Sequence, residues 1–186
     1  MLQVIYSFNY DVILLNNESV YLLTDFCCGD NEIDRYVKED ALSDSECGKG
    51  VTYLVINKSN GRLIAYYTLS STSILYFDEV NINGNIRGIP SIEIKMFAVS
   101  TIYQDLLYHD DEFGDNLISS IVLGSVIGDI YNISMNILGV KMIVLHSVPD
   151  AIDFYSRNFF KPMGEYKSLQ DDYSKGCTPM YMPLFE

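Results

Sequence analysis

A long apolar stretch, Leu117 to Leu145, constrains the fold most strongly. Its first part repeats apolar residues at helical spacing, and Gly139 stands where a C-terminal glycine commonly ends a helix. The next residues, Val140 to His146, form the continuous apolar run typical of a buried strand. Polar or helix-breaking residues interrupt the stretch at Asp129, Asn132, Asn136, Gly139 and Lys141. The stretch therefore predicts a buried helix from Asp115 to about Leu138 and then a central strand, and not a membrane span.

Shorter patterns predict the elements of the N-terminal half. Leu2 to Phe8 is typical of a first strand, and Asp30 to Leu42 has helical spacing with Asp30 in the cap position. Val51 to Ile56 and Leu63 to Ser70 read as two strands. The dipeptide Asn60-Gly61 between them is a strong hairpin signal.

The centre of the chain alternates short strands with irregular segments. Ile74 to Phe77 predicts a short strand, "NINGNIRGIP" (81–90) predicts a loop, and Pro90 opens a strand from Ser91 to Val99. The acidic segment 100–116 shows no regular period, so we expect it to be irregular.

The C-terminal part predicts a short helix and a last strand. Pro149 suits the first turn of a helix that runs to about Arg157, and "TPMYMPL" reads as a strand bounded by prolines within a final hairpin. Strands and helices in this order predict an α+β fold with a mixed sheet. We find no repeat and no linker, so we expect one domain over residues 1–186.

Composition narrows the classes of partner. The 186 residues are 48% hydrophobic and 20% charged, with a net charge of −13. A nucleic-acid partner, tRNA included, is disfavoured because phosphate binding needs clustered Lys and Arg. An acidic protein instead suits a cationic acceptor such as a polyamine, an aminoglycoside-like amine or a lysine of a basic protein.

Cysteines and histidines offer no metal site at the sequence level. The four cysteines include the adjacent pair Cys27 and Cys28, no C-x-x-C occurs, and only His109 and His146 accompany them. We expect no metal and reduced thiols in the cytoplasm. The N-terminal segment lacks a basic n-region and carries Asp11 within its apolar part, which argues against a signal peptide.

Four motifs occur in an order that resembles the GNAT superfamily of acyl-coenzyme A N-acyltransferases. "FCCGDNEIDRYVKEDAL" resembles the opening helix of the toxin-like branch of that family, F-x-C-G-x-x-x-L-D-x-F-L. "GRLIAYYTLS" is similar to G-x-x-x-G-Y-Y-T-L-S. "IPSIEIKMFAV", followed by "YQ", resembles the strand that lines the acyl group, and "AIDFYSRNFF" resembles A-x-x-F-Y-x-x-x-G-F. The resemblance covers nearly the whole chain and implies a sheet with a splayed parallel strand pair.

The resemblance implies transfer of an acetyl group from acetyl-CoA to a primary amine. Backbone groups around Phe97, Ala98 and Val99 would bind the acyl-pantetheine chain, and Tyr155 would protonate the leaving thiolate as the general acid. The alternative for Tyr155 is an amphipathic residue on a packed helix, with its hydroxyl bonded to backbone or water. Phe159 stands where the family has glycine.

Glu93 is a candidate general base on the acyl-lining strand. Strand alternation puts it on the same side as Phe97 and Val99. The alternative is a carboxylate hydrogen-bonded to solvent. Many acceptors in the family lose their proton to water, so the family does not require a base.

The phosphate loop departs from the family pattern Q/R-x-x-G-x-G/A. In residues 111–116 only Gly114 matches, and Asp111, Glu112 and Asp115 bring negative charge. Backbone amides at the start of the long helix could still bind coenzyme A phosphates. The cofactor-binding residues predicted there are Phe113, Gly114, Asp115, Asn116 and Leu117.

Three functions follow from these observations. The first is an N-acetyltransferase acting on a cationic small molecule or protein. The second is a degenerate member without turnover that works by binding a partner, as the altered phosphate loop suggests. The third is a toxin that acetylates aminoacyl-tRNA and is held by an antitoxin, which the net charge disfavours. The resemblance also makes a homodimer plausible.

Overall fold

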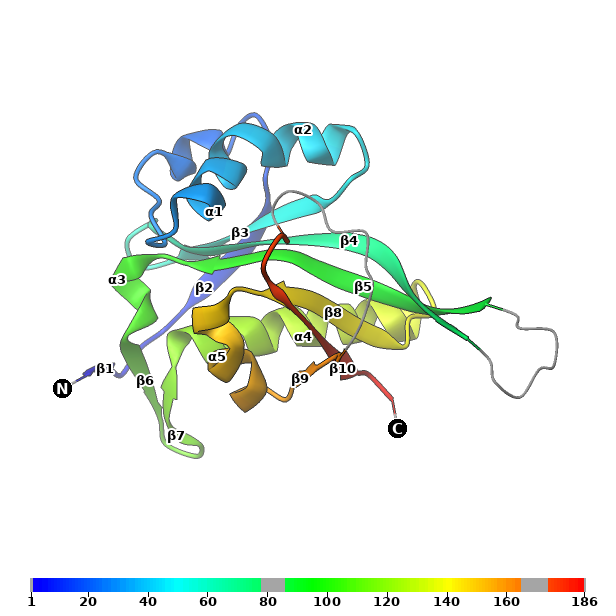
Figure 1. The fold of residues 1–186 in the computed structure, drawn as a ribbon. Coiled ribbons are helices and arrows are strands. Elements are labelled where there is room, and N and C mark those ends of the chain that lie inside the picture. The colour runs from blue at the N-terminus through cyan, green and yellow to red at the C-terminus, as the bar shows by residue number, and fades with distance from the viewer. Residues whose placement is uncertain (1, 78–85, 165–173, 186) are drawn as a thin grey trace. The chain divides into compact units, whose positions relative to one another are not determined.

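The computed structural model describes residues 2–77, 86–164 and 174–185. The elements, in chain order, are β1 (Gln3–Ile5), β2 (Tyr10–Leu14), η1 (Val20–Leu23), α1 (Asn31–Arg35), the π-helical turn η2 (Tyr36–Asp40), α2 (Ala41–Glu46), β3 (Val51–Asn57), β4 (Leu63–Phe77), β5 (Ile86–Val99), α3 (Thr101–Gln104), β6 (Leu106–Asp110), β7 (Gly114–Leu117), α4 (Ile118–Asn136), β8 (Met142–Ser147), η3 (Pro149–Ala151), α5 (Ile152–Arg157), β9 (Lys161–Pro162) and β10 (Thr178–Pro183) (Figure 1). These elements give the mixed α+β class that the sequence predicts.

The chain divides into two compact units, each built from two segments. Unit 1 is Met1–Leu69 with Lys95–Ser125, and unit 2 is Ser70–Ile94 with Val126–Glu186. The elements β4, β5 and α4 contribute residues to both. The expectation of one domain over residues 1–186 stays a prediction.

Unit 1 contains an antiparallel meander and a small second sheet. β2 pairs with β3, and β3 pairs with the part of β4 that ends at Leu69. The Asn60-Gly61 hairpin is confirmed: Asn57 and Arg62 close it by a backbone hydrogen bond of 2.9 Å, and Gly61 has φ +69°. In the second sheet, β6 lies between β1, which is parallel to it, and β7, which is antiparallel.

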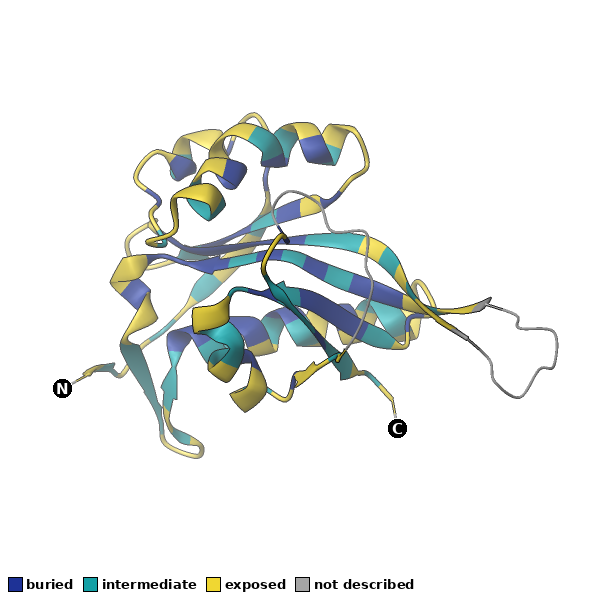
Figure 2. Cartoon of the chain, in the orientation of Figure 1, coloured by how far each residue is buried: buried dark blue, intermediate teal, exposed yellow. Residues whose placement is uncertain are grey.

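The segments η1, α1, η2 and α2 of unit 1 lie over its meander, and they contribute the buried residues Leu23, Tyr36, Val37 and Ala41 to the core (Figure 2). Asp30 caps α1 as predicted, because its carboxylate accepts hydrogen bonds from the amides of Glu32 and Ile33. The predicted single helix is instead α1, the π-helical turn η2 and α2, ending at Glu46.

Unit 2 is organised around β8. The β5 segment Ser91–Ile94 pairs with it in parallel, as far as Ile94 opposite Leu145, and β10 pairs with it antiparallel. β9 then pairs with β10. Pro149 occupies the first turn of η3, as predicted, and α5 follows directly. The carboxyl end of β8 therefore leads straight into the helix that carries Tyr155.

Helix α4 is shorter than the predicted helix at both ends. It begins at Ile118 because Gly114–Leu117 pairs with β6 as a strand, and it ends at Asn136. Gly139 is not left-handed, so it does not cap the helix in the predicted way. Ile118, Val122 and Ile130 are fully buried. The helix is long and apolar enough to cross a membrane by length and composition alone, and about a third of it (33%) is buried within the protein.

Several strand boundaries also differ from the prediction. The first predicted strand is only Gln3–Ile5, and β2 was missed. Residues 63–77 form one strand, without the break expected after Ser70. Residues 86–90, predicted as loop, belong to β5, while 81–85 lie outside the described residues. The segment predicted as irregular holds α3 and the β6–β7 hairpin.

Candidate functional site

The hydrogen bonds at the C-terminus of α5 hold Tyr155 in place. Asn158 is the C-cap; the amide of Phe160 donates to the Tyr155 carbonyl at 3.1 Å, and the amide of Phe159 donates to the Ser156 carbonyl at 3.3 Å. These two bonds form a Schellman motif. The expected apolar contact of that motif is the Tyr155–Phe160 ring pair, with centroids 5.8 Å apart. The orientation of Tyr155 is therefore fixed by the helix terminus itself.

Phe159 occupies the glycine position of this motif in glycine-like geometry. Its φ is +70°, and it is the only non-glycine residue with positive φ in the described part of the chain. A left-handed conformation is strained for a residue with a Cβ. The residue is 80% exposed and borders an open cavity of about 870 Å³ together with Phe160 and Phe185. Phe159 replaces the glycine found in the family that the sequence resembles, and the turn still has its two hydrogen bonds.

Tyr155 is a buried residue, and its phenol keeps its proton near neutral pH. The residue is 8% exposed, and within the described residues its hydroxyl makes no hydrogen bond. Burial raises the pKa of the Tyr155 phenol far above its ordinary value, and the Cys177 thiol contributes to the rise. A phenol in this state can donate a proton to a developing anion but cannot serve as a base near neutral pH.

Glu93 takes part in a three-residue hydrogen-bonded group in unit 2. Its Oε1 lies 3.1 Å from His146 Nδ1, and its Oε2 accepts a 3.1 Å bond from the Ser70 hydroxyl. The three residues come from β4, β5 and β8. The side chains of Glu93 and His146 are 23% and 14% exposed. Glu93 is therefore not simply bonded to solvent, which was the alternative.

His146 was not among the predicted site residues. It lies two positions beyond Val144, the residue opposite Glu93 in the parallel register, and so faces the same side of the sheet. The only sequence signal was one polar residue at the end of an otherwise apolar strand. The register that pairs His146 with Glu93 is a long-range feature that no local pattern reports.

Phe97, Ala98 and Val99 form the carboxyl end of β5 in unit 1. Ala98 and Val99 are 4% and 6% exposed, and Phe97 is half-buried. The Gln104 amide group donates to the Val99 carbonyl at 2.9 Å and to the Cys28 carbonyl at 2.7 Å. The backbone at this end of β5 is thus anchored by one side-chain hydrogen bond from Gln104, which also bonds to the Cys28 carbonyl.

The predicted phosphate loop is the turn of the β6–β7 hairpin. Asp110 Oδ1 accepts hydrogen bonds from the amides of Glu112 and Phe113, both at 2.9 Å, and these bonds lower the pKa of Asp110. The Phe113 amide is therefore already engaged. Gly114 has φ +72°, a conformation that glycine adopts without strain.

One acid of this hairpin, Asp115, is hydrogen-bonded to a histidine. His109 Nδ1 lies 2.6 Å from Asp115 Oδ1, and that hydrogen bond raises the pKa of His109. The sequence placed acids in the first turn of the long helix, but α4 begins at Ile118 and has none in its first turn. The amides at the start of α4 therefore belong to Ile118, Ser119 and Ser120, residues that the sequence did not single out.

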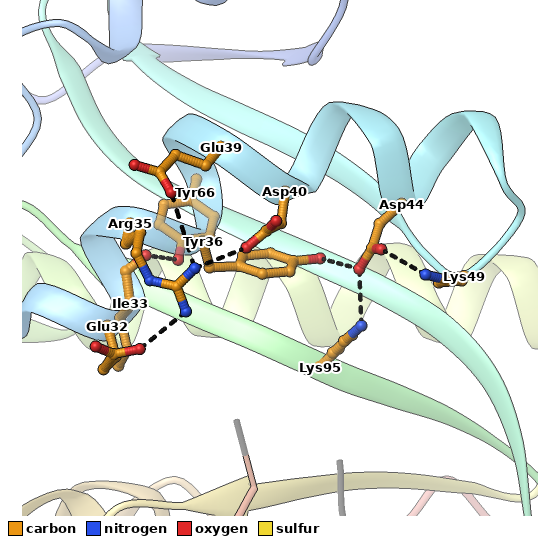
Figure 3. Close-up of polar contacts among 10 residues, drawn as sticks. All are labelled: Glu32, Ile33, Arg35, Tyr36, Glu39, Asp40, Asp44, Lys49, Tyr66 and Lys95. Carbon is orange, nitrogen blue, oxygen red and sulfur yellow. Dashed lines mark hydrogen bonds and ion pairs between the residues drawn. The ribbon is translucent and has the colours of Figure 1, made fainter. Parts of the chain in front are cut away.

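A second buried polar cluster lies between α2 and β5 within unit 1 (Figure 3). The Tyr36 hydroxyl donates to Asp44 Oδ2 at 3.2 Å, and Lys95 Nζ lies 2.8 Å from the same oxygen. The Asp44 and Lys95 side chains are only 11% and 14% exposed. Burial alone would raise the pKa of Asp44, but the hydrogen bond and charge of Lys95 lower it, so Asp44 stays ionised.

The π-helical turn explains how Tyr36 and Asp44 meet. The Ala41 amide donates to the Tyr36 carbonyl, an i to i+5 bond. In a regular helix of about 3.6 residues per turn, residues eight apart do not align. One extra residue in the turn brings Tyr36 and Asp44 onto one face. Helical spacing alone could not predict this cluster.

Among the residues described, no three His, Cys, Asp or Glu side chains come together closely enough to hold a metal ion.

No protein-family model matches the sequence, but the fold is similar to those of solved bacterial toxins. A structure described as a bacterial toxin shares 18% identity, with a TM-score of 0.68, over 96% of this chain and 92% of that chain. A Tyr-to-Phe mutant of the toxin AtaT shares 14% identity with a TM-score of 0.69, over 96% and 92%. A Tyr-to-Phe mutant of KacT shares 16% with a TM-score of 0.66, over 94% and 95%.

AtaT is also similar to this chain in three of its complexes. The first is AtaTR with bound acetyl-CoA. The second is AtaT bound to the C-terminus of its antitoxin AtaR, and the third is AtaT with acetyl-methionyl-tRNAfMet. At such identities the likeness establishes the fold. The chain therefore has the same α+β fold as the toxins AtaT and KacT.

Proposed function

We propose that the protein is an N-acetyltransferase that moves an acetyl group from acetyl-CoA to a primary amine. The observation that carries the proposal is Tyr155, a buried phenol that keeps its proton and donates it to no group within the described residues. Such a group suits a general acid that acts on an anion formed only during the reaction.

In the proposed reaction the amine nitrogen attacks the thioester carbonyl carbon. A carbon–nitrogen bond forms, the carbon–sulfur bond breaks, and the coenzyme A thiolate leaves. Tyr155 gives its proton to this thiolate, and the amine loses one proton, which restores the phenol through solvent. Two toxins with this fold, AtaT and KacT, were solved as Tyr-to-Phe mutants, which supports a role for a tyrosine in this fold.

We propose that backbone groups of Phe97, Ala98 and Val99 bind the acyl-pantetheine chain. The anchoring of Val99 by Gln104 supports a rigid strand end. We further propose that coenzyme A phosphates bind at Phe113, Gly114, Asp115, Asn116 and Leu117, through groups other than the Phe113 amide, which Asp110 already engages. The hydrogen bond between His109 and Asp115 supports this proposal, because it engages one of the acids that the sequence placed there.

The acceptor amine belongs to one of two classes. The net charge of −13 favours a cationic small molecule or a lysine of a basic protein. The complex of AtaT with acetyl-methionyl-tRNAfMet favours the amino group of an aminoacyl-tRNA. We propose both classes as candidates. We also propose Glu93 as the general base, which takes the proton that the amine loses.

Partners and location follow the same proposal. An antitoxin is a candidate partner, because AtaT of the same fold binds AtaR. A homodimer is a second proposal, which the sequence resemblance motivates and the 15 Tyr and 9 Phe of the chain would allow. None of the four cysteines forms a disulfide, which fits the proposed reducing cytoplasm.

Transfer of label from isotope-labelled acetyl-CoA tests the function. The protein is incubated with spermidine, with a lysine-rich peptide and with charged tRNA in separate reactions. We expect label on one acceptor, and expect its removal when Tyr155→Phe replaces the wild type. Label on none of the three, or equal labelling by the variant, would contradict the proposal.

A further inference from the structure

We infer that an apolar face of unit 2 is the binding site for a helix of a partner protein, one that carries both apolar and acidic side chains. The face consists of the open cavity of about 870 Å³ at the end of α5 and of the neighbouring α4 residues Tyr131 and Met135. We call it the cavity face. The lining of the cavity includes the apolar residues Met142, Phe159, Phe160, Met182, Leu184 and Phe185.

The apolar surface continues from the cavity onto α4. The Tyr131 and Phe185 rings are in contact, with centroids 5.8 Å apart. Met135 follows Tyr131 by four residues and therefore lies on the same side of the helix. Phe159, Phe185, Tyr131 and Met135 are all exposed. Large contiguous apolar patches are uncommon on monomeric soluble proteins and usually mark interaction sites.

Phe159 supports a binding role most directly. Its φ of +70° is strained for any residue with a Cβ, and its 80% exposure means that the ring gains little from the folding of the chain. Strained residues of this kind are concentrated at functional sites. A partner that covers the ring would bury its apolar surface and so offset the strain.

The charges around the cavity fit an acidic partner. Of the described residues that line it, only Lys161 is charged, and Arg157 and Lys141 each adjoin a lining residue in the sequence. All three are exposed, and none forms an ion pair with a carboxylate of the described residues. Arg157 Nε donates instead to the Asp153 carbonyl at 3.2 Å. Three such cations differ from a chain that has 25 acids and 12 bases, and carboxylates of a partner would complement them.

The edge of the sheet at this face favours a helix over an added strand. In the described part of the sheet β9 is the last strand, and it consists only of Lys161 and Pro162. β10 ends at Pro183. Strand addition needs a row of free amides, and proline has none. A helix that inserts apolar side chains into a groove has no such requirement.

Two other occupants fit the cavity face less well. In a symmetric dimer the same face meets itself, so the cations Lys141, Arg157 and Lys161 of both copies would be brought together. An anionic membrane would attract these cations, but the net charge of −13 repels it. A cavity is also concave, whereas interfacial membrane binding uses an apolar surface that enters the bilayer.

Fluorescence anisotropy with two labelled helical peptides tests the inference. Both peptides have leucines at helical spacing, and they differ only in that the glutamates of the acidic peptide are lysines in the basic peptide. The net charge of −13 alone predicts tighter binding of the basic peptide. The cavity face predicts the opposite, and we expect the acidic peptide to bind about 10-fold more tightly. Equal affinities, a preference for the basic peptide, or binding of neither would overturn the inference.

Substitutions show whether the peptide binds at the cavity face. Phe159→Ala and Phe185→Ala change exposed residues, so both variants should fold, and each should weaken binding of the acidic peptide about 10-fold. Lys161→Glu should weaken it about 5-fold at low salt and less at high salt. Lys175→Glu is the matched control. It makes the same change of charge at an exposed residue that precedes the other end of β10, and it should bind like the wild type. Unchanged binding in both Phe variants would overturn the inference.

Two further measurements distinguish the other occupants. Sedimentation velocity over a range of protein concentrations reports self-association, and flotation with phosphatidylglycerol vesicles reports membrane binding. We expect Phe159→Ala and Phe185→Ala to change neither result. A dimer that both variants dissociate would assign the cavity face to a second copy, and vesicle binding that both abolish would assign it to a membrane. Either result would overturn the inference.

Discussion

Two buried tyrosines of this protein, Tyr36 in unit 1 and Tyr155 in unit 2, differ in what their hydroxyls do. Burial raises the pKa of both phenols, so both keep their protons near neutral pH. The Tyr36 hydroxyl donates to Asp44, inside a cluster that also holds Lys95. The Tyr155 hydroxyl has no such acceptor within the described residues. Both phenols therefore have a raised pKa, and the hydrogen bond to Asp44 distinguishes Tyr36 from Tyr155, the tyrosine for which we propose a catalytic role.

The largest expected effect is on turnover in Tyr155→Phe. Loss of a general acid should lower the rate about 10²–10⁴-fold. Because the lost hydroxyl has no hydrogen bond to the described residues, the free energy of unfolding should change by no more than about 0.5 kcal/mol. Denaturant unfolding and the label-transfer assay measure the two quantities. A loss of stability as large as that of a core mutation would make Tyr155 structural and remove the contrast with Tyr36.

The next largest effect is expected from Asp44→Ala. The substitution leaves the Lys95 ammonium largely buried without its carboxylate, which should cost about 3 kcal/mol of unfolding free energy. Adding Lys95→Met to Asp44→Ala removes the ammonium group that lost its carboxylate. The double variant should therefore have a higher free energy of unfolding than Asp44→Ala alone. Equal stability of the single and double variants would show that the pair is not coupled.

The Asp44 carboxylate also predicts a pH dependence. The pKa of Asp44 is lower in the folded state than its ordinary value of 3.8, so its stabilising contribution is complete above that value and disappears as the pH falls through the folded pKa. Acid unfolding of Asp44→Asn should therefore lose less stability below about pH 4 than that of the wild type.

Tyr36→Phe sharpens the comparison directly, since it repeats the chemical change made at Tyr155. Here a hydrogen bond to a charged acceptor is lost, at a cost of about 1.5 kcal/mol. We expect this loss in denaturant unfolding, together with wild-type acetyl-CoA binding. Equal stability of Tyr36→Phe and Tyr155→Phe would mean that the two hydroxyls do not differ in the way described.

The smallest effect is expected from Phe159→Gly. Glycine adopts a φ of +70° without strain, so the variant should be more stable by up to about 1 kcal/mol, after allowance for its more flexible unfolded chain. Phe159→Ala is the control, because it removes the ring but keeps the Cβ. If alanine stabilises as much as glycine, exposure of the ring and not backbone strain is the cause.

Features with local chemical causes could be predicted from the sequence. Asp30 as a helix cap, the Asn60-Gly61 hairpin and Pro149 in a first helical turn each depend on a few neighbouring residues. The β6–β7 hairpin was missed because its turn is rich in acids and its strands are short. A catalytic role for Tyr155 could be proposed from the sequence only through a family resemblance, since its local pattern fits a packed helix equally well.

The remaining site features depend on distant residues. His146 reaches Glu93 through the parallel register of β5 and β8, which joins residues 53 positions apart. Tyr36 reaches Asp44 through one extra residue in a π-helical turn, which breaks the regular helical period. In the first case the alignment of two strands decides which side chains meet, and in the second the number of residues in one helical turn does. Both depend on packing beyond the neighbouring residues.

Calorimetric titration of acetyl-CoA into the wild type and Tyr155→Phe, at low and at moderate salt, tests the central claim most directly. The account predicts micromolar binding to both, with equal affinity, because Tyr155 acts on the departing thiolate and not on the bound thioester. No binding by the wild type at either salt would contradict it. The fold would then serve a protein that acts by binding a partner.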